Sequence, residues 1–126
     1  MLTDAPTFSS FAVDDVTAAR DFYAGTLGLG VTEEPDMGPI LRLHLGDGRD
    51  VLVYEKPDFV PATYTVLNFE VGDVDAVADA LAERGVALLR YEGFDQDERG
   101  IARGQGPAIG WFADPAGNIL AVLETG

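Results

Sequence analysis

The sequence predicts an α+β fold built from two copies of a β-α-β-rich half. Each half starts with a strand-like segment, residues 7–13 and 63–71, that leads into an acidic helix cap. The junctions match in sequence, because Val-Asp-Asp-Val at 13–16 is followed 58 residues later by Val-Gly-Asp-Val at 71–74. The same order of strand, cap, helix and glycine surrounds both tetrads. The chain therefore contains an internal repeat.

The first half combines a strand, an amphipathic helix and three shorter strands. Alternation along 7–13 places Phe8, Ser10 and Ala12 on one face of the first strand. An aspartate at 14 or 15 can cap the helix, and Gly28 can end it. The apolar stripe of this helix comprises Val16, Ala19, Phe22, Tyr23 and Leu27. Further strands are predicted at about 30–34, 39–45 and 51–56, with Gly-Asp-Gly at 46–48 as a hairpin turn.

The second half repeats this order. Asp73 can cap a helix that ends at Gly85, and its apolar stripe comprises Val74, Val77, Ala78 and Leu81. Strands are predicted near 86–90 and at about 109–113 and 118–124, with a polar, glycine-rich segment at 92–108. The residues Asp-Pro-Ala-Gly-Asn at 114–118 form a turn, because proline fixes φ and glycine supplies positive φ.

The boundary between the halves is expected at 57–61, where two prolines favour an extended connector. We expect one domain over 1–126, with module one at 1–58 and module two at 61–126. A half of this size covers only one face of its sheet with its helix, so the other face needs apolar cover elsewhere. Two half-sheets that enclose a shared cavity would supply that cover.

Composition excludes several classes of protein. The 126 residues are 47% hydrophobic and 24% charged, and none is cysteine, which excludes disulfides, thiolate metal sites and cysteine nucleophiles. No apolar run approaches the roughly 18 residues of a membrane span, and the first residues lack the basic start of a signal peptide, so a cytoplasmic protein is expected. The net charge of −14 disfavours nucleic acid as a partner. It either serves solubility or attracts a cationic ligand.

Two motifs resemble a known family. Residues 11–16 (Phe-Ala-Val-Asp-Asp-Val), 18–23 (Ala-Ala-Arg-Asp-Phe-Tyr) and 27–29 (Leu-Gly-Leu) resemble the opening of the vicinal oxygen chelate superfamily. That superfamily includes glyoxalase I, extradiol dioxygenases and bleomycin-resistance proteins. Residues 111–120 (Trp-Phe-Ala-Asp-Pro-Ala-Gly-Asn-Ile-Leu) resemble its C-terminal signature. The resemblance implies two tandem βαβββ modules, each a cupped half-barrel, in a homodimer with pockets inside the cups.

The resemblance also implies where a metal would bind. Enzymes of the superfamily hold a divalent cation with His and Glu at four inward strand positions. In this sequence those positions fall on Phe8, on or beside Val53, on Val66 and on Ala121. Divalent cations need oxygen, nitrogen or thiolate donors, which these side chains lack. We therefore expect no metal and no cofactor.

Other residues could rebuild a polar site. His44 is the only histidine, and a structural role is the main alternative to metal ligation. Glu55 and Glu70 point inward if alternation is counted from Val53 and Val66, which would allow a carboxylate site. Ser10, His44 and Glu55 could form a nucleophilic triad, although no nucleophile-elbow or oxyanion-hole motif accompanies them.

Aromatic residues are the remaining candidates for ligand contact, with core packing as the alternative for each. They are Phe8, Tyr54, Phe59, Tyr64, Tyr91, Phe94, Trp111 and Phe112. Trp111 is favoured because it follows the Gly-Gln-Gly-Pro loop at 104–107, a candidate flap. The preceding segment carries four carboxylates, Glu92, Asp95, Asp97 and Glu98, which form either a solvated face or a receptor for amines.

Two functions compete on these residues. The first is a metal-free binding protein that sequesters a small aromatic or cationic molecule, as in antibiotic resistance. Its candidate ligand-binding residues are Phe8, Ser10, His44, Val53, Glu55, Tyr64, Val66, Asn68, Trp111 and Ala121. The second is a metal-dependent lyase or dioxygenase with substituted ligands. The sequence favours the first and identifies no catalytic residue.

Overall fold

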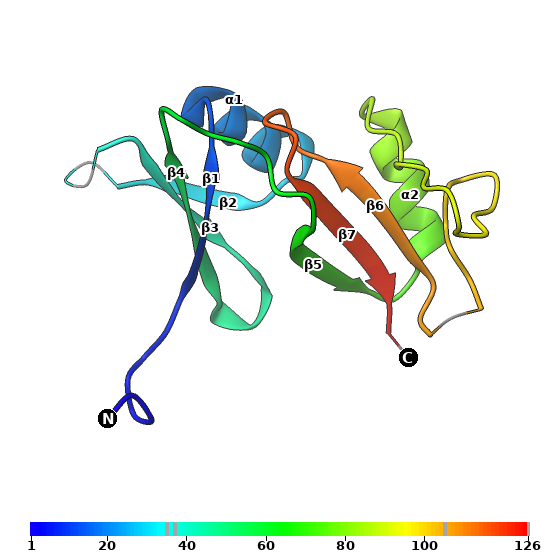
Figure 1. Cartoon of the computed structure of the whole chain (residues 1–126), viewed down its shortest axis with the longest axis horizontal. Helices are drawn as coiled ribbons and strands as arrows, with labels where there is room; N and C mark the ends of the chain where they lie inside the picture. Colours follow the sequence, from blue (N-terminus) through cyan, green and yellow to red (C-terminus); the bar gives the residue numbers. More distant parts are fainter. Residues whose placement is uncertain (35, 37, 105, 126) are drawn as a thin grey trace. The chain divides into compact units, whose positions relative to one another are not determined.

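The computed structural model describes residues 1–34, 36, 38–104 and 106–125, and it divides the chain into two compact units, Met1–Val60 and Pro61–Gly126 (Figure 1). Each unit has its own sheet and its own helical segment. The predicted α+β class is confirmed, and neither sheet closes into a barrel. None of the helices in the described part of the chain has the length and hydrophobicity of a membrane span.

Unit 1 contains a four-stranded sheet. Its elements are β1 (Ser9–Val13), α1 (Val16–Arg20), η1 (Asp21–Thr26), β2 (Gly30–Glu33), β3 (Ile40–His44), η2 (Gly46–Gly48) and β4 (Asp50–Glu55). The strand order is β1-β4-β3-β2, with β1 parallel to β4 and the other pairs antiparallel. The turn at η2 places Asp47 at φ 62° and Gly48 at φ 68°, the left-handed geometry that the Gly-Asp-Gly sequence predicts.

The first helix begins at the predicted cap and widens before it ends. The Asp15 carboxylate accepts hydrogen bonds from the N–H groups of Thr17 (3.0 Å) and Ala18 (3.2 Å). After five α-helical residues the chain continues as the π-helical turns of η1, where the sequence predicts a regular helix. The Tyr23 ring in η1 lies 6.0 Å from the Phe11 ring of β1, so this segment packs on the sheet.

Unit 2 contains a three-stranded sheet. Its elements are β5 (Thr65–Val71), α2 (Val74–Glu83), β6 (Ile109–Ala113) and β7 (Ile119–Glu124), in the strand order β5-β7-β6. β5 is parallel to β7, and β6 is antiparallel to it. The Asp73 carboxylate caps α2 through the N–H of Ala76 at 3.0 Å. At the predicted turn, the Asp114 carboxylate accepts a hydrogen bond from the Asn118 N–H at 2.8 Å.

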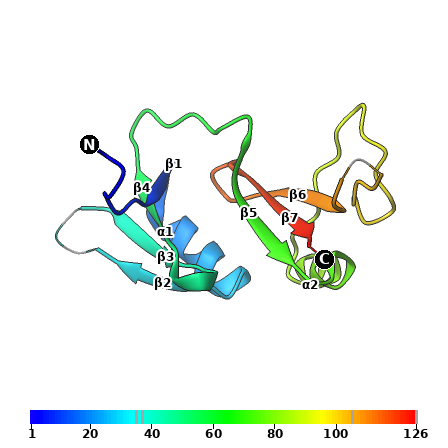
Figure 2. The same cartoon turned by 90° about the horizontal axis from the view of Figure 1, so that it is seen from below.

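The strand predicted near 86–90 is wrong, because these residues have no regular structure. Two separate segments share the edge of β6 instead (Figure 2). The Leu89 N–H donates to the Trp111 carbonyl at 2.7 Å, while Ala102 exchanges hydrogen bonds of 2.8 and 3.1 Å with Ile109. Since each segment forms backbone hydrogen bonds with only one residue of β6, neither is a regular strand of the sheet.

A second capping device is repeated in both units. The last residue of β4, Glu55, accepts a hydrogen bond from the Val16 N–H at 3.1 Å. The last residue of β7, Glu124, accepts one from the Val74 N–H, also at 3.1 Å. Each glutamate satisfies a free N–H in the first helical turn and places a negative charge at the helix N-terminus, which the helix dipole favours.

Candidate functional site

The sheet of unit 1 has one face covered by α1 and η1. Residues on this face include Phe11, which contacts Tyr23, and Glu55, which caps α1. Strand alternation and register then assign Val13, Leu41, Leu43, Val51 and Val53 to the same face. The opposite, helix-free face of unit 1 carries Ser10, Ala12, Thr32, Ile40, Arg42, His44, Asp50, Leu52 and Tyr54.

The same reasoning divides the sheet of unit 2. Glu124 caps α2, so Leu120, Val122 and their register partners Phe69 and Phe112 lie on the helix-covered face. The helix-free face of unit 2 carries Asn68, Glu70, Ile109, Trp111, Ala113, Ile119, Ala121 and Leu123.

These assignments correct two predicted placements. Val53 is fully buried beneath the helix-covered face, and Glu55 is a helix cap rather than an inward-pointing carboxylate. A triad of Ser10, His44 and Glu55 is therefore contradicted, because Ser10 and His44 lie on the helix-free face. The candidate aromatic Phe112 is also a core residue, 1% exposed.

The other predicted residues have varied positions. Ser10, His44, Asn68, Trp111 and Ala121 lie on the helix-free faces, and their part in ligand binding stays a prediction. Phe8 and Tyr64 immediately precede β1 and β5 and are 66% and 69% exposed. Val66 lies at a register irregularity of β5, between Thr65 and Leu67.

The repeat of the glutamate caps identifies the counterpart of Ala121 in unit 1. Glu55 is paired with Val13, and Glu124 with Val71, the corresponding residue of the repeat. Three residues before each glutamate stand Leu52 and Ala121, both on a helix-free face and both buried. Leu52 thus replaces Val53 as the equivalent position, and leucine also lacks a donor atom for a metal. Among the described residues, no group of three His, Cys, Asp or Glu side chains could hold a metal ion.

A polar network crosses the helix-free face of unit 1. The His44 ring lies between Asp50, whose carboxylate is 3.2 Å from Nδ1, and the Thr32 hydroxyl, 2.6 Å from Nε2. Arg42 joins the same Asp50 at 3.4 Å and Glu34 at 2.6 Å. The hydrogen bond that the Arg42 guanidinium donates to the Glu34 carboxylate is the main cause of a raised pKa for Arg42. Both ring nitrogens of His44 thus have a partner within the unit, which is typical of a structural role for this residue.

An aromatic cluster occupies the corresponding part of unit 2. The Trp111 ring centroid lies 5.5 Å from that of Tyr91 and 5.2 Å from that of Phe94. Tyr91 and Phe94 also contact each other at 6.3 Å. Trp111 comes from β6 on the helix-free face, whereas its two neighbours come from the segment that follows Leu89 at the edge of the sheet. Phe94 remains 49% exposed and Trp111 half-buried, so part of the ring surface is accessible.

The carboxylates beside this cluster are not equivalent. Asp97 accepts hydrogen bonds from the N–H groups of Arg99 and Ile101, both at 2.9 Å, and from Arg103 at 3.2 Å. Glu92 and Asp95, one on either side of Phe94, are exposed. The predicted flap at 104–107 includes Gln105, which lies outside the described residues.

A family model described as Glyoxalase/Bleomycin resistance protein/Dioxygenase superfamily matches residues 7–122. The chain belongs to this superfamily. This finding confirms the resemblance seen in the opening and closing motifs. No curated protein matches the sequence.

Solved structures similar to this superfamily member include an antibiotic binding protein from a Streptomyces species. It is 25% identical, with 98% of this chain and 99% of that chain covered and a TM-score of 0.73. A superfamily member from Sphaerobacter thermophilus is 23% identical, with 95% and 98% covered and a TM-score of 0.70. A putative glyoxalase family protein from Bacillus anthracis is 17% identical over the whole of both chains, with a TM-score of 0.73. The last two likenesses show the fold alone.

Proposed function

We propose that the protein binds and sequesters a planar aromatic small molecule on the helix-free face of unit 2, without a metal. The observation that carries this proposal is the group of three rings formed by Trp111, Tyr91 and Phe94. Flat aromatic ligands stack on such rings or meet them edge to face, and they remove apolar surface from water as they do so. Ala121, which pairs with Trp111 across the strands, leaves the indole a small neighbour.

Charge supports a cationic ligand. Glu92 and Asp95, which precede and follow the exposed Phe94 in the sequence, are themselves exposed, and the chain carries a net charge of −14. An acidic field raises the local concentration of a cation and increases its association rate. The preferred ligand is therefore a planar aromatic compound with a positive charge, a description that fits some antibiotics. The similar Streptomyces protein, described as antibiotic binding, supports the same class of function.

The residues at the superfamily's metal positions favour binding over metal-dependent catalysis. Ala121 and Leu52 have no donor atom, and neither do Phe8 and Val66. The proposal also includes a homodimer, which the superfamily resemblance implies, and a cytoplasmic location, which the sequence composition favours. Stoichiometric manganese, iron, nickel or zinc in untagged purified protein would contradict it and favour the lyase or dioxygenase alternative.

Calorimetric titration with two matched probes tests the proposal. Proflavine is a planar cation and acridone a neutral compound of similar shape, so we expect saturable binding of both and tighter binding of proflavine. Trp111→Ala should weaken binding about tenfold, since an aromatic contact contributes about 0.5–1.5 kcal/mol beyond its buried area and the loss of that buried area adds to it. Trp111→Phe should recover part of the affinity. No saturable binding to either probe, or equal affinity in Trp111→Ala, would overturn the proposal.

A further inference from the structure

The segment from Leu89 to Arg103 carries two of the three aromatic rings, although the described residues place almost no regular secondary structure in it. Its ends meet the edge strand β6 through Leu89 and Ala102. Between these ends, the backbone-to-backbone hydrogen bonds found among the described residues belong only to turns and single bridges, such as that from the Phe94 N–H to the Tyr91 carbonyl, so side-chain contacts must help to fix the position of the two rings. Two independent sets of contacts do so.

The first set comes from one side chain, Gln96. Its Nε2 donates hydrogen bonds to the carbonyls of Leu89 (2.8 Å) and Gly100 (2.7 Å), and its Oε1 accepts one from the Tyr91 N–H at 2.8 Å. The amide thus connects the start of the segment, at Leu89 and Tyr91, with its later part, at Gly100. A neutral amide suits this position because two of its partners are acceptors and one is a donor.

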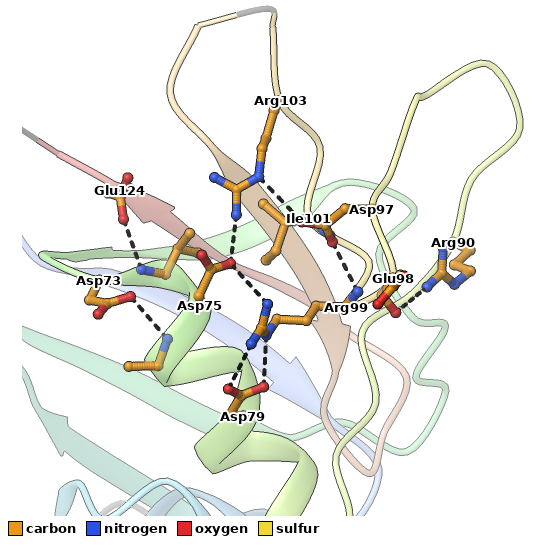
Figure 3. Close-up of polar contacts among 12 residues, drawn as sticks. Asp73, Asp75, Asp79, Arg90, Asp97, Glu98, Arg99, Ile101, Arg103 and Glu124 are labelled. Carbon is orange, nitrogen blue, oxygen red and sulfur yellow. Dashed lines mark hydrogen bonds and ion pairs between the residues drawn. The ribbon is translucent and has the colours of Figure 1, made fainter.

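The second set ties the segment to α2, as Figure 3 shows. Arg99 makes two hydrogen bonds to the Asp79 carboxylate, from Nε at 2.8 Å and from Nη2 at 3.1 Å. Arg103 bonds Asp75 at 2.5 Å and Asp97 at 3.2 Å. Asp75 and Asp79 are both on α2, so two arginines of the segment bind one helix. The paired geometry of Arg99 restricts orientation as well as distance.

We propose that Gln96 and the Arg99–Asp79 pair are positioning residues that hold Tyr91 and Phe94 against Trp111 and thereby set the affinity of the aromatic site. This proposal rests on the proposed function and adds to it the residues that pre-organise the site. A site whose rings are already in place loses less conformational entropy on binding. Exposed ion pairs add little to global stability, so the effect of the Arg99–Asp79 pair falls on the loop rather than on the fold.

Gln96→Glu is the sharpest test of the first contact set. The substitution keeps the shape and the acceptor for Tyr91 but replaces the donor with an oxygen that faces two carbonyls. Glu98→Gln is the matched control, because it is the reverse substitution in the same loop. Among the described residues, the only hydrogen bond found for Glu98 is accepted by its backbone carbonyl, which the substitution keeps. Trp111 is the only tryptophan, so its emission reports the cluster in the ligand-free protein.

We expect Gln96→Glu to increase acrylamide quenching of Trp111, to change the thermal midpoint little, and to weaken proflavine binding about tenfold. The added negative charge would by itself favour a cation, so weaker binding cannot be a charge effect. The control should match the wild type in quenching and stay within about twofold in affinity. Unchanged quenching or unchanged affinity in Gln96→Glu would overturn the proposal.

A charge exchange tests the Arg99–Asp79 pair. Arg99→Asp and Asp79→Arg should each increase Trp111 quenching, because each places like charges together. The double exchange should restore most of the wild-type quenching and affinity, a rescue that general destabilisation would not give. Equal quenching in the double and single variants would refute the pairing. If the wild type binds neither probe, the proposed function and the affinity claim both fail, while the ligand-free quenching still decides whether these residues position the rings.

Discussion

The two units differ most on the faces that their helices leave uncovered. Arg42 in unit 1 and Trp111 in unit 2 hold corresponding positions, since Arg42 pairs with Leu52 and Trp111 with Ala121. Arg42 belongs to a polar network in which its partners are already present, whereas Trp111 belongs to an aromatic cluster with accessible ring surface. The helix-covered faces, by contrast, both carry a buried apolar core, with a capping glutamate at the end of the last strand. A duplicated scaffold has therefore kept its core and diverged where packing does not constrain it.

The edge of each sheet explains how this divergence is possible. In unit 1 the edge strand β2 places Thr32 opposite Arg42. Regular backbone pairing with β3 therefore fixes the position of this polar side chain. In unit 2 the edge is covered by the 89–103 segment, which is long enough to bring Tyr91 and Phe94 to Trp111. In unit 2 an irregular segment thus stands at the sheet edge, where unit 1 has a fourth strand, and it supplies two rings of the aromatic site.

The largest expected effect tests whether the two cores are equivalent. Leu43 and Phe112 are fully buried at corresponding positions of β3 and β6. Truncation should cost about 2–5 kcal/mol for Leu43→Ala and about 3–5 kcal/mol for Phe112→Ala, because each leaves a cavity. Urea denaturation measures both losses. A cost below about 1 kcal/mol at one site alone would break the comparison.

The next effect tests whether the helix-free faces differ in function. Arg42→Met should leave proflavine affinity within about twofold, while Trp111→Ala should lower it about tenfold. Methionine keeps the length of the arginine stem, so the variant removes the charge with little change of packing. Parallel calorimetric titrations measure both. A large loss in Arg42→Met would show that the polar network also contacts the ligand.

Removal of the glutamate caps should have a smaller and equal effect in both units. Glu55→Ala and Glu124→Ala each leave the first N–H of a helix without its carboxylate, at a cost of about 1 kcal/mol. Matched thermal melts of the two variants, with Glu98→Gln as a control, check this expectation. Costs that differ by more than about 1 kcal/mol would show that the repeated device serves the two units unequally.

The smallest effect is a loosening of unit 2 in acid. The hydrogen bond from Arg99 holds the pKa of Asp79 below its ordinary value of 3.8. Burial acts to raise the pKa of Asp97, but the Ile101 N–H, Arg103 and the Arg99 N–H together lower it. A carboxylate whose pKa is lower in the folded than in the unfolded state stabilises the fold at pH values above its unfolded-state pKa. That stabilisation is lost as the pH falls through its folded-state pKa. Acrylamide quenching of Trp111 should therefore stay constant from pH 7 to about 5 and rise below about 4. A rise already at pH 6 would contradict this cause.

The sequence was most informative about elements that local chemistry determines. The aspartate caps and the 58-residue repeat identify both helices and the strands before them, and the Asp-Pro-Ala-Gly-Asn turn locates β6 and β7. The sequence wrongly predicts a strand near 86–90, because the edge of β6 is bonded at Trp111 by Leu89 and at Ile109 by the distant Ala102. Both are tertiary contacts.

The candidate site was partly predictable. Trp111, Tyr91 and Phe94 were all candidates, but their contact depends on how the loop folds back. The metal position predicted on or beside Val53 corresponds to the neighbouring Leu52, because a shift of one residue along a strand exchanges its two faces. The pairing of His44 with Asp50 follows from the sequence, since a three-residue turn at 46–48 sets Leu45 opposite Arg49 and therefore His44 opposite Asp50.

The glutamate caps also bear on how the protein arose. In each unit the glutamate joins the last strand to the start of the helix of the same unit. The residue after each glutamate joins the last strand to the end of the first: the Lys56 N–H donates to the Val13 carbonyl at 3.0 Å, and the Thr125 N–H donates to the Val71 carbonyl at 3.1 Å. These bonds are internal to a unit, so a chain with the units in reverse order would retain all of them. Duplication of a gene that encodes one such unit, followed by fusion of the two copies, would therefore preserve these hydrogen bonds in both copies.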